Sequence, residues 1–220
     1  MFLSLTIPFN RYIQALLDTL TMVGVSGFIA FLAGIPLAVT LIVTAPGGFL
    51  PSPRFNRIVG GVINGFRATP FIVLLVALLP FTRWVAGTTI GVWAAVVPMA
   101  ISATPFFARI VEVNLREVDH GLVEAAQAMG CKKWDIVRHV YLSEALPGIV
   151  GGLTITLVAL IGSSAMAGAV GAGGLGDLAI RYGYQRFDTQ VMVIVIAVLI
   201  AMVTAVQLTG DRYARWLRDR

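Results

Sequence analysis

The sequence is poor in charge: only 12% of its 220 residues are Asp, Glu, Lys or Arg, whereas 58% are hydrophobic. An ordinary soluble domain carries roughly 25% charged residues, so this chain has too little polar surface to enclose its apolar residues in water. A protein that is surrounded by hydrocarbon has no such requirement. The shortage of charge therefore argues against a soluble fold and predicts an all-α, polytopic membrane protein.

Other absences narrow the function. Cysteine occurs once, at Cys131, so the chain forms no disulfide with itself. His120 and His139 stand apart from any cysteine pair, and no metal site is expected. The sequence has no G-x-x-x-x-G-K-[ST] motif, so we expect no ATP hydrolysis by this chain and no cofactor bound to it. The apolar segments also lack Ser/His, paired Asp and His/Glu groupings, which argues against an enzyme.

Five long apolar segments make up most of the chain. They cover about residues 19–44 and 61–79, and lie within residues 84–108, 145–176 and 189–210. A helix needs about 20 apolar residues to cross the hydrocarbon core, so each segment predicts one transmembrane helix of a single domain over residues 1–220. A short turn is expected around residues 82–89. No cationic region precedes the first segment, which we therefore expect to be a retained helix and not a signal peptide.

Basic residues fall mainly on one side of this five-span arrangement. Twelve of the sixteen lie in three segments: Arg54, Arg57 and Arg67; Arg109, Arg116, Lys132, Lys133 and Arg138; and Arg212, Arg215, Arg218 and Arg220. Cytoplasmic segments are enriched in Lys and Arg, so we expect an outside N-terminus and a cytoplasmic C-terminus. This orientation explains the basic residues better than nucleic-acid binding does. Arg67 is expected at the cytoplasmic end of the second span, where snorkelling to headgroups is favoured over an internal ion pair.

Acidic residues are expected only at span ends and in loops. Carriers that are coupled to protons or sodium usually place an acidic group or a broken-helix ion site within the membrane. The absence of acidic residues from the predicted spans argues against a secondary transporter or a channel.

The third connection, residues 109–147, holds 11 of the 27 charged residues and yet has apolar positions at helical spacing. One stripe consists of Leu115, Val118, Leu122, Val123, Ala126 and Met129, and the other of Ile136, Val137, Val140 and Tyr141. Gly130 lies between them and suits a chain reversal. The pattern predicts an amphipathic helical hairpin on the cytoplasmic face. It is either an interfacial element on the headgroups or a docking element for a soluble partner.

The hairpin residues resemble the "EAA" signature of binding-protein-dependent ABC importer permeases. That signature reads Glu-Ala-Ala, three residues, Gly, nine residues, and then Ile, any residue, Leu and Pro. The matching residues here are Glu124, Ala125, Ala126, Gly130, Val140 and Leu142, with Val140 in place of Ile and Ser143 where the family often has Pro. The resemblance implies that these residues, with Met129, form a coupling helix in a cleft of the ATPase subunit. Glu124 is either an interface acid or a charge at a helix N-terminus.

Further segments, at residues 64–75, 80–83, 87–91, 163–176 and 182–187, look like those of methionine importer permeases. The resemblance implies import of methionine, both D and L, across a bacterial inner membrane. It also implies two copies of this chain, two ATPase subunits that hold ATP and Mg, and an extracytoplasmic substrate-binding protein. Related permeases for glycine betaine or other amino acids share the Gly-rich stretch and the Arg-x-x-Pro element, so one of these substrates is the alternative.

Three groups of residues are left with two interpretations each. Ser163, Ser164 and Met166 are candidates for the translocation path, although Met166 is equally suited to packing. Arg181, Tyr182 and Tyr184 either contact the binding protein or anchor the outer loop at the membrane interface. Residues 171–176 match G-x-G-x-x-G, but they follow a predicted span and no strand, so an outer turn is expected and not a nucleotide site.

Overall fold

The computed structural model describes residues 7–219; Arg220, which contributed to the predicted orientation, lies outside them. Within these residues the chain forms helices and connections, with no strand. The helices in order are α1 (Phe9–Thr44), α2 (Pro53–Ala68), α3 (Phe71–Ala77), α4 (Leu79–Ala86), α5 (Val92–Arg116), α6 (His120–Ala128), α7 (Lys133–Ile136), the π-helical turn η1 (Val137–Tyr141), α8 (Leu142–Glu144), α9 (Leu146–Ala169), α10 (Gly174–Leu178), the π-helical turn η2 (Ala179–Tyr184) and α11 (Thr189–Arg218).

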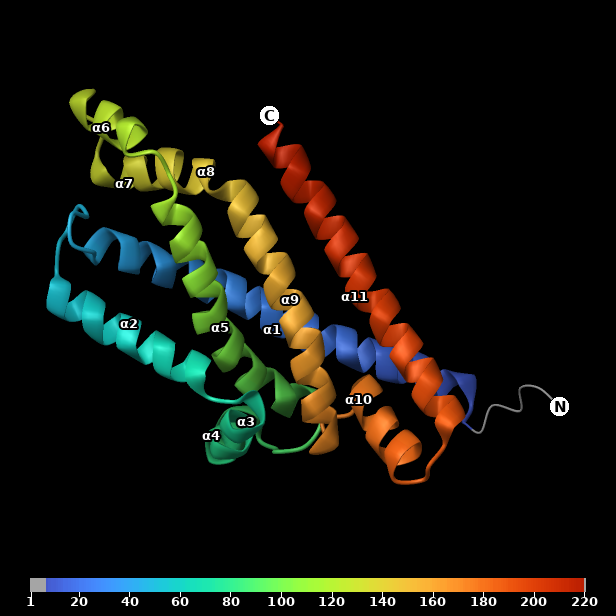
Figure 1. Ribbon diagram of the computed structural model, residues 1–220. Helices are drawn as coiled ribbons and strands as arrows, with labels where there is room; N and C mark the ends of the chain where they lie inside the picture. Colours follow the sequence, from blue (N-terminus) through green and yellow to red (C-terminus); the bar gives the residue numbers. More distant parts are fainter. Residues whose placement is uncertain (1–6, 220) are drawn as a thin grey trace.

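Helix α5 is the centre of the bundle. It packs against α1, α9 and α2 (Figure 1). Of the residues in its most apolar 18-residue stretch, 61% are buried. Helix α11 packs mainly on α9. It is the most peripheral of the four long apolar helices, because only 17% of the residues in its most apolar 18-residue stretch are buried. Because most of the apolar surface of α11 faces outward, that surface needs lipid or another chain against it.

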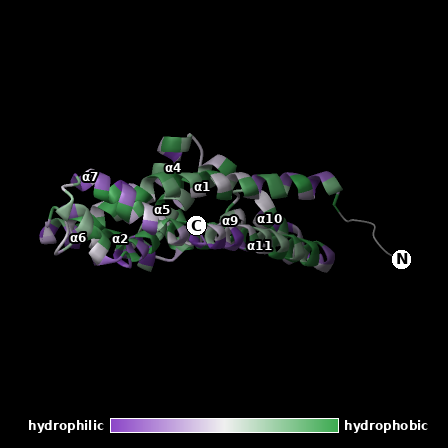
Figure 2. Ribbon diagram, turned by 90° about the horizontal axis from the view of Figure 1, so that it is seen from above, coloured by the Kyte–Doolittle hydropathy of each residue, from purple (hydrophilic) through white to green (hydrophobic). Residues whose placement is uncertain are grey.

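The two ends of the bundle differ. The α6–α7 segment and the end of α11 lie at one end, whereas the start of α1 and the short helices α4 and α10 lie towards the other (Figure 1). Colouring by hydropathy shows many hydrophilic residues around α6 and α7 and a largely hydrophobic α1 (Figure 2). Helix α1 thus starts at the end opposite to that where α11 finishes, which is what an odd number of spans requires.

Four single helices are long and apolar enough to cross a membrane: α1, α5, α9 and α11. The pair α2 and α3 makes the fifth span when it is counted as one. The five-span prediction therefore agrees with the structure.

The second span differs from the prediction, because it is not one helix over residues 61–79. The axes of α2 and α3 are bent by 105° at Thr69 and Pro70. Proline has no N–H for a helical hydrogen bond, and it disfavours the α conformation of the preceding residue. Thr69 is accordingly extended, with φ −80 and ψ 125.

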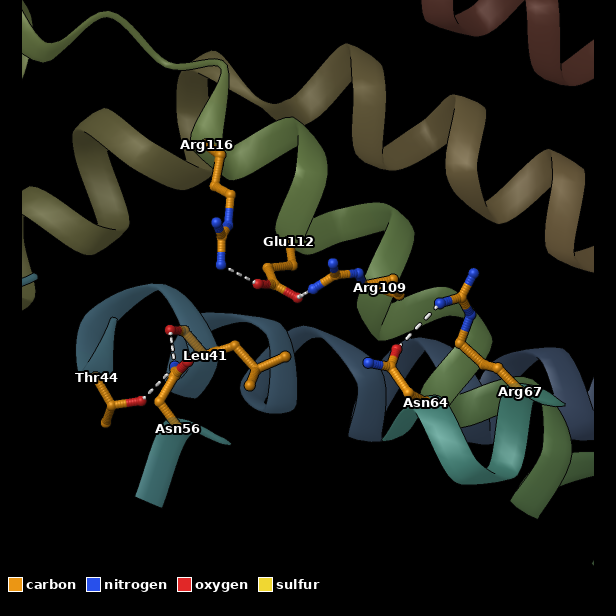
Figure 3. A network of polar contacts seen from close by, with 8 residues as sticks. All are labelled: Leu41, Thr44, Asn56, Asn64, Arg67, Arg109, Glu112 and Arg116. Carbon is orange, nitrogen blue, oxygen red and sulfur yellow. Dashed lines mark hydrogen bonds and ion pairs between the residues drawn. The ribbon is translucent and has the colours of Figure 1, made fainter. Parts of the chain in front are cut away.

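The bend also corrects the expected position of Arg67. This residue lies in the last turn of α2, about 20 Å along the helix axis from Pro53 at 1.5 Å per residue. It therefore lies next to the bend, at the far end of α2 from Pro53, and not near the start of the span that was expected at the cytoplasmic side. Its guanidinium donates to the Oδ1 of Asn64 at 3.4 Å (Figure 3).

Several helices extend further than expected. Helix α1 begins at Phe9, α4 occupies most of the expected turn at residues 82–89, and α11 continues to Arg218. Because α1 and α5 are longer, Asp18 and Glu112 lie inside them. Helices of this length extend beyond the hydrocarbon core, which about 20 residues cross, so the prediction that acidic residues occur only at span ends and in loops stays a prediction.

Glu112 is neutralised on its own helix. Its carboxylate is buried, and it accepts from Arg109 and from Arg116, each at 2.6 Å (Figure 3). The i, i+3 and i, i+4 spacings place all three side chains on one face of α5. Charges interrupt the apolar sequence here without ending the helix, because the acid has two cationic partners that reach towards solvent.

Candidate functional site

The hairpin predicted within residues 109–147 is present, but it occupies only the middle of that range. The first eight residues of that range are the end of α5, and the last two begin α9. Asp119 caps α6 by accepting from the N–H of Gly121 at 2.8 Å. The chain reverses at Gly130, whose φ is +78. Residues other than glycine rarely adopt this backbone conformation. The predicted reversal at Gly130 is confirmed.

The inner face of the hairpin has a small core. Val123, Ala126 and Ile136 are buried against one another, and Phe49 of the α1–α2 connection packs on them. The ring of Phe49 also meets that of Tyr141 edge-on, with 6.0 Å between the centroids. Burial raises the pKa of the Tyr141 phenol above its ordinary value.

The outer face of the hairpin carries apolar side chains that nothing in the chain covers. Met129 is 76% exposed and Trp134 66%, and Leu122 is also exposed. Of the predicted stripe, Val123 and Ala126 are buried against the hairpin core, whereas Leu122 and Met129 are exposed.

The residues of the EAA-like motif occupy both faces of this hairpin. Glu124, Ala125, Met129 and Gly130 are exposed, Ala126 is buried, and Val140 and Leu142 are half-buried. Glu124 lies beyond the first turn of α6, and Asp119 caps that helix. The interpretation of Glu124 as a charge at the helix N-terminus is therefore not met.

A hydrogen-bonded turn holds the hairpin to the rest of the chain. The ammonium group of Lys133 donates to the carbonyl oxygen of Phe49 at 2.9 Å. Asn56, in the first turn of α2, donates to the carbonyl oxygen of Leu41 at 2.7 Å and to Thr44 Oγ1 at 3.0 Å (Figure 3). Contacts through this turn thus join the hairpin to the end of α1 and the start of α2.

A second candidate site is a cavity of about 130 Å³ beside the bend of the second span. It is lined by Phe66, Arg67, Thr69, Phe71, Ser102, Ala103, Phe106, Thr156, Ala159, Leu160 and Ser163. Of the predicted path residues, Ser163 lines this cavity. Ser164 is buried, and its hydroxyl donates to the carbonyl oxygen of Ile161 at 2.7 Å. Met166 is exposed and is not part of the lining.

The predicted outer-loop residues Arg181, Tyr182 and Tyr184 all lie on η2. Arg181 is paired with Asp177 at 2.9 Å, and the guanidinium of Arg186 lies 4.6 Å from the ring centroid of Tyr182. Tyr184 is exposed. Phe187, a further residue of the predicted outer loop, is 84% exposed and has a φ of 56, unusual for a residue other than glycine.

The glycine-rich segment at residues 171–176 forms a turn and the start of α10, and it follows helix α9, not a strand. The N–H of Leu175 donates to Thr19 Oγ1 at 2.9 Å, which ties α10 to α1. The segment therefore lacks the strand–turn–helix setting of a dinucleotide site.

Comparisons with known proteins agree with this arrangement. A family model described as "Binding-protein-dependent transport system inner membrane component" matches residues 30–220. The probable D-methionine transport system permease protein MetI of Vibrio cholerae is 49% identical over 203 residues, which cover 92% of this chain and 90% of that protein. The D-methionine transport system permease protein MetI of Escherichia coli K12 is 49% identical over 156 residues, covering 71% of this chain and 72% of that protein.

Among solved structures, a chain of the MetNI methionine ABC transporter in inward facing conformations superposes with a TM-score of 0.93. It is 46% identical, and the match covers 95% of this chain and 97% of that one.

Proposed function

The chain belongs to the family of binding-protein-dependent transport system inner membrane components, and from this premise we propose that it is the permease subunit of a methionine ABC importer. The observation that carries the proposal is the likeness to a methionine transporter chain over nearly the whole length, at high identity. The hairpin and the span cavity lie within the matched fold. The chain is a multi-pass protein of a bacterial inner membrane.

In this proposal the hairpin is the docking element for the ATPase subunit. The uncovered side chains of Leu122, Met129 and Trp134 supply apolar anchors for a groove on a partner. Exposed Ala125 and Gly130 allow close approach of that partner. Charged residues around the anchors orient the complex. The coupling residues that we propose are those of the EAA-like motif together with Met129: Glu124, Ala125, Ala126, Met129, Gly130, Val140 and Leu142.

The working assembly in this proposal has two copies of the chain, two ATPase subunits and an extracytoplasmic substrate-binding protein. The N-terminus lies outside and the C-terminus in the cytoplasm, because the basic residues gather at the hairpin end. Arg181, Tyr182 and Tyr184 then belong to the outer face, towards the binding protein. ATP and Mg bind the partner ATPase, and this chain performs no catalysis.

ATP drives transport in such an assembly only if it binds one conformation better than the other. In this proposal the hairpin contacts the ATPase subunit, so it transmits the ATP-dependent change of conformation to the permease. Its motion passes along the backbone to α5 and α9, and through Phe49 to the α1–α2 turn.

Uptake of labelled methionine into proteoliposomes tests the function. With this chain, its ATPase and its binding protein present, we expect ATP-dependent uptake that excess methionine competes and that betaine or glutamine does not. Competition by betaine or glutamine would replace the substrate and keep the permease. Uptake without the ATPase would overturn the proposal.

Gly130→Trp tests the docking role of the hairpin. A bulky side chain at a positive φ strains the reversal by about 1–3 kcal/mol and obstructs the docking face. We expect ATP hydrolysis to be uncoupled from uptake, with membrane insertion retained. Gly87 is the matched control, because its φ of +73 and open surroundings resemble those of Gly130 at the other end of the molecule. Normal uptake by Gly130→Trp, or an equal loss in Gly87→Trp, would contradict the assignment.

A further inference from the structure

Arg67 is a cation beside the bend of the second span, and it has no acidic partner among the described residues. None of the ion pairs among residues 7–219 includes it. Its one hydrogen bond is the long contact to the side-chain oxygen of Asn64, at 3.4 Å. An ionisable residue at this depth is costly and usually serves a site. Glu112 on α5 shows the alternative, since that buried charge has two partners on its own helix.

The position of Arg67 explains how its charge is tolerated while no ligand is present. It lies in the last turn of α2, where the helix dipole favours a cation. Arg67 lines the cavity of about 130 Å³, and its side chain is exposed. These features reduce the cost of the charge, but they leave most of its five N–H donors without a protein acceptor.

The rest of the cavity lining is of two kinds. Ser102 of α5 and Ser163 of α9 are polar lining residues, and the Ser163 hydroxyl also donates to the carbonyl oxygen of Ala159 at 3.1 Å. Phe66, Phe71 and Phe106 bring aromatic rings. A guanidinium pairs best with a planar carboxylate, in two parallel hydrogen bonds. Aromatic rings make favourable contacts with a thioether sulfur.

We propose that Arg67 binds the carboxylate of the transported amino acid, and that the phenylalanines at the bend hold its apolar, thioether-containing side chain. The inference rests on the proposed function and adds a substrate-contact residue to it. The site lies where the second span changes direction, so a change in the bend also changes the distance between Arg67 and the rings. Binding at this place is therefore coupled to the conformation of the permease.

A thiol reporter in the cavity tests the site. The permease–ATPase complex carries Cys131→Ser, which removes the native thiol, and Ser163→Cys, with Ala159→Cys as a second reporter. The rate of maleimide labelling is measured against methionine and against methioninol, which lacks the carboxylate. We expect methionine to slow the labelling and methioninol to have little effect.

The Arg67 variants then identify the residue responsible. In Arg67→Gln we expect the methionine concentration for half-protection to rise about tenfold or more, because a hydrogen-bonded ion pair is lost. Arg67→Lys should keep part of the protection, since it keeps the charge without the planar fork. Arg83→Gln removes an exposed arginine of α4 outside the lining and should change nothing.

Three outcomes would overturn the site: unchanged protection in Arg67→Gln, equal protection by methioninol, or protection by inorganic phosphate in place of methionine. Absence of methionine protection at both reporters, in complexes that still import methionine, would also overturn it while the proposed function stands. Failure of the unmodified complex to import methionine, with protection intact, would instead count against the proposed function.

Discussion

Two connections between spans have the same local structure and opposite surroundings. In the hairpin, α7 is followed by the π-helical turn η1, and beyond the fourth span α10 is followed by the π-helical turn η2. Helix α10 is sunk in the main core, where Leu175 is fully buried and Leu178 nearly so. The hairpin protrudes, and its own core has only three buried residues, Val123, Ala126 and Ile136.

The composition of the two segments accounts for this difference. Helix α10 has one charged residue, Asp177, and its glycines allow close contact with α1 and α9. The hairpin carries many charges that must stay in water, yet Met129 and Trp134 are also left uncovered. Exposed apolar side chains on a charged element indicate a surface kept for a partner. We infer that α10 contributes mainly to stability and the hairpin mainly to coupling, and three substitutions test that contrast.

Leu175→Ala should have the largest effect on stability. Removing a fully buried leucine side chain leaves a cavity and costs about 2–5 kcal/mol. Thermal unfolding of the purified protein in detergent measures the loss. Met129→Ala in the hairpin is the matched control, and it should change the stability by less than about 0.5 kcal/mol. Similar losses for the two variants would remove the distinction between the embedded and the protruding connection.

Thr19→Val should have the next largest effect. Valine keeps the shape of threonine but removes the oxygen that accepts from the buried N–H of Leu175, at a cost of about 1–3 kcal/mol. The same unfolding measurement applies. In Thr21→Val the lost hydroxyl bonds only to the carbonyl of Leu17 on the same helix, so a smaller change is expected. An equal loss in both variants would show that the link between α1 and α10 contributes nothing.

Phe49→Ala should have the smallest effect on global stability, and its effect should be local. Without the ring, the three-residue core of the hairpin loses the side chain that covers it. We expect amide exchange in α6 and α7 to be about tenfold faster, which corresponds to roughly 1.4 kcal/mol, and exchange in α10 to be unchanged. Leu50→Ala removes an exposed neighbour and serves as control. Unchanged exchange in the hairpin would mean that Phe49 does not hold it.

The sequence predicted the number of spans, the hairpin and its reversal, because long apolar runs and a glycine between amphipathic stripes have few alternative structures. The ends of the spans were less predictable. A charged residue usually indicates the end of an apolar span. In α5, however, Arg109 and Arg116 pair with Glu112 at helical spacing, so the helix continues past these charges. Such pairing depends on the register within the helix, which hydropathy alone does not report.

The cavity was only partly predictable. Ser163 was expected near the path, and it lines the cavity. Arg67 was expected at a span end, because a proline in a span indicates a kink but does not show that the helix axis turns by 105° at Pro70. The residues of the lining come from α2, α3, α5 and α9, and no local pattern shows that these helices meet there. Phe187 belongs to the predicted outer loop, but its positive φ had no signal in the sequence, because that conformation depends on the fold around it.

The 105° bend between α2 and α3 also determines which side of the molecule lipid is able to cover. An interrupted helix leaves backbone groups without intrahelical partners, and hydrocarbon chains offer none. Irregular backbone at this depth is tolerated only against protein or water. The face that carries Pro70 is therefore closed to acyl chains, and the outer surface of α11, which is helical throughout, is open to them. The break at Pro70 therefore predicts that the side of the chain with the cavity faces a neighbouring subunit or water, and not lipid.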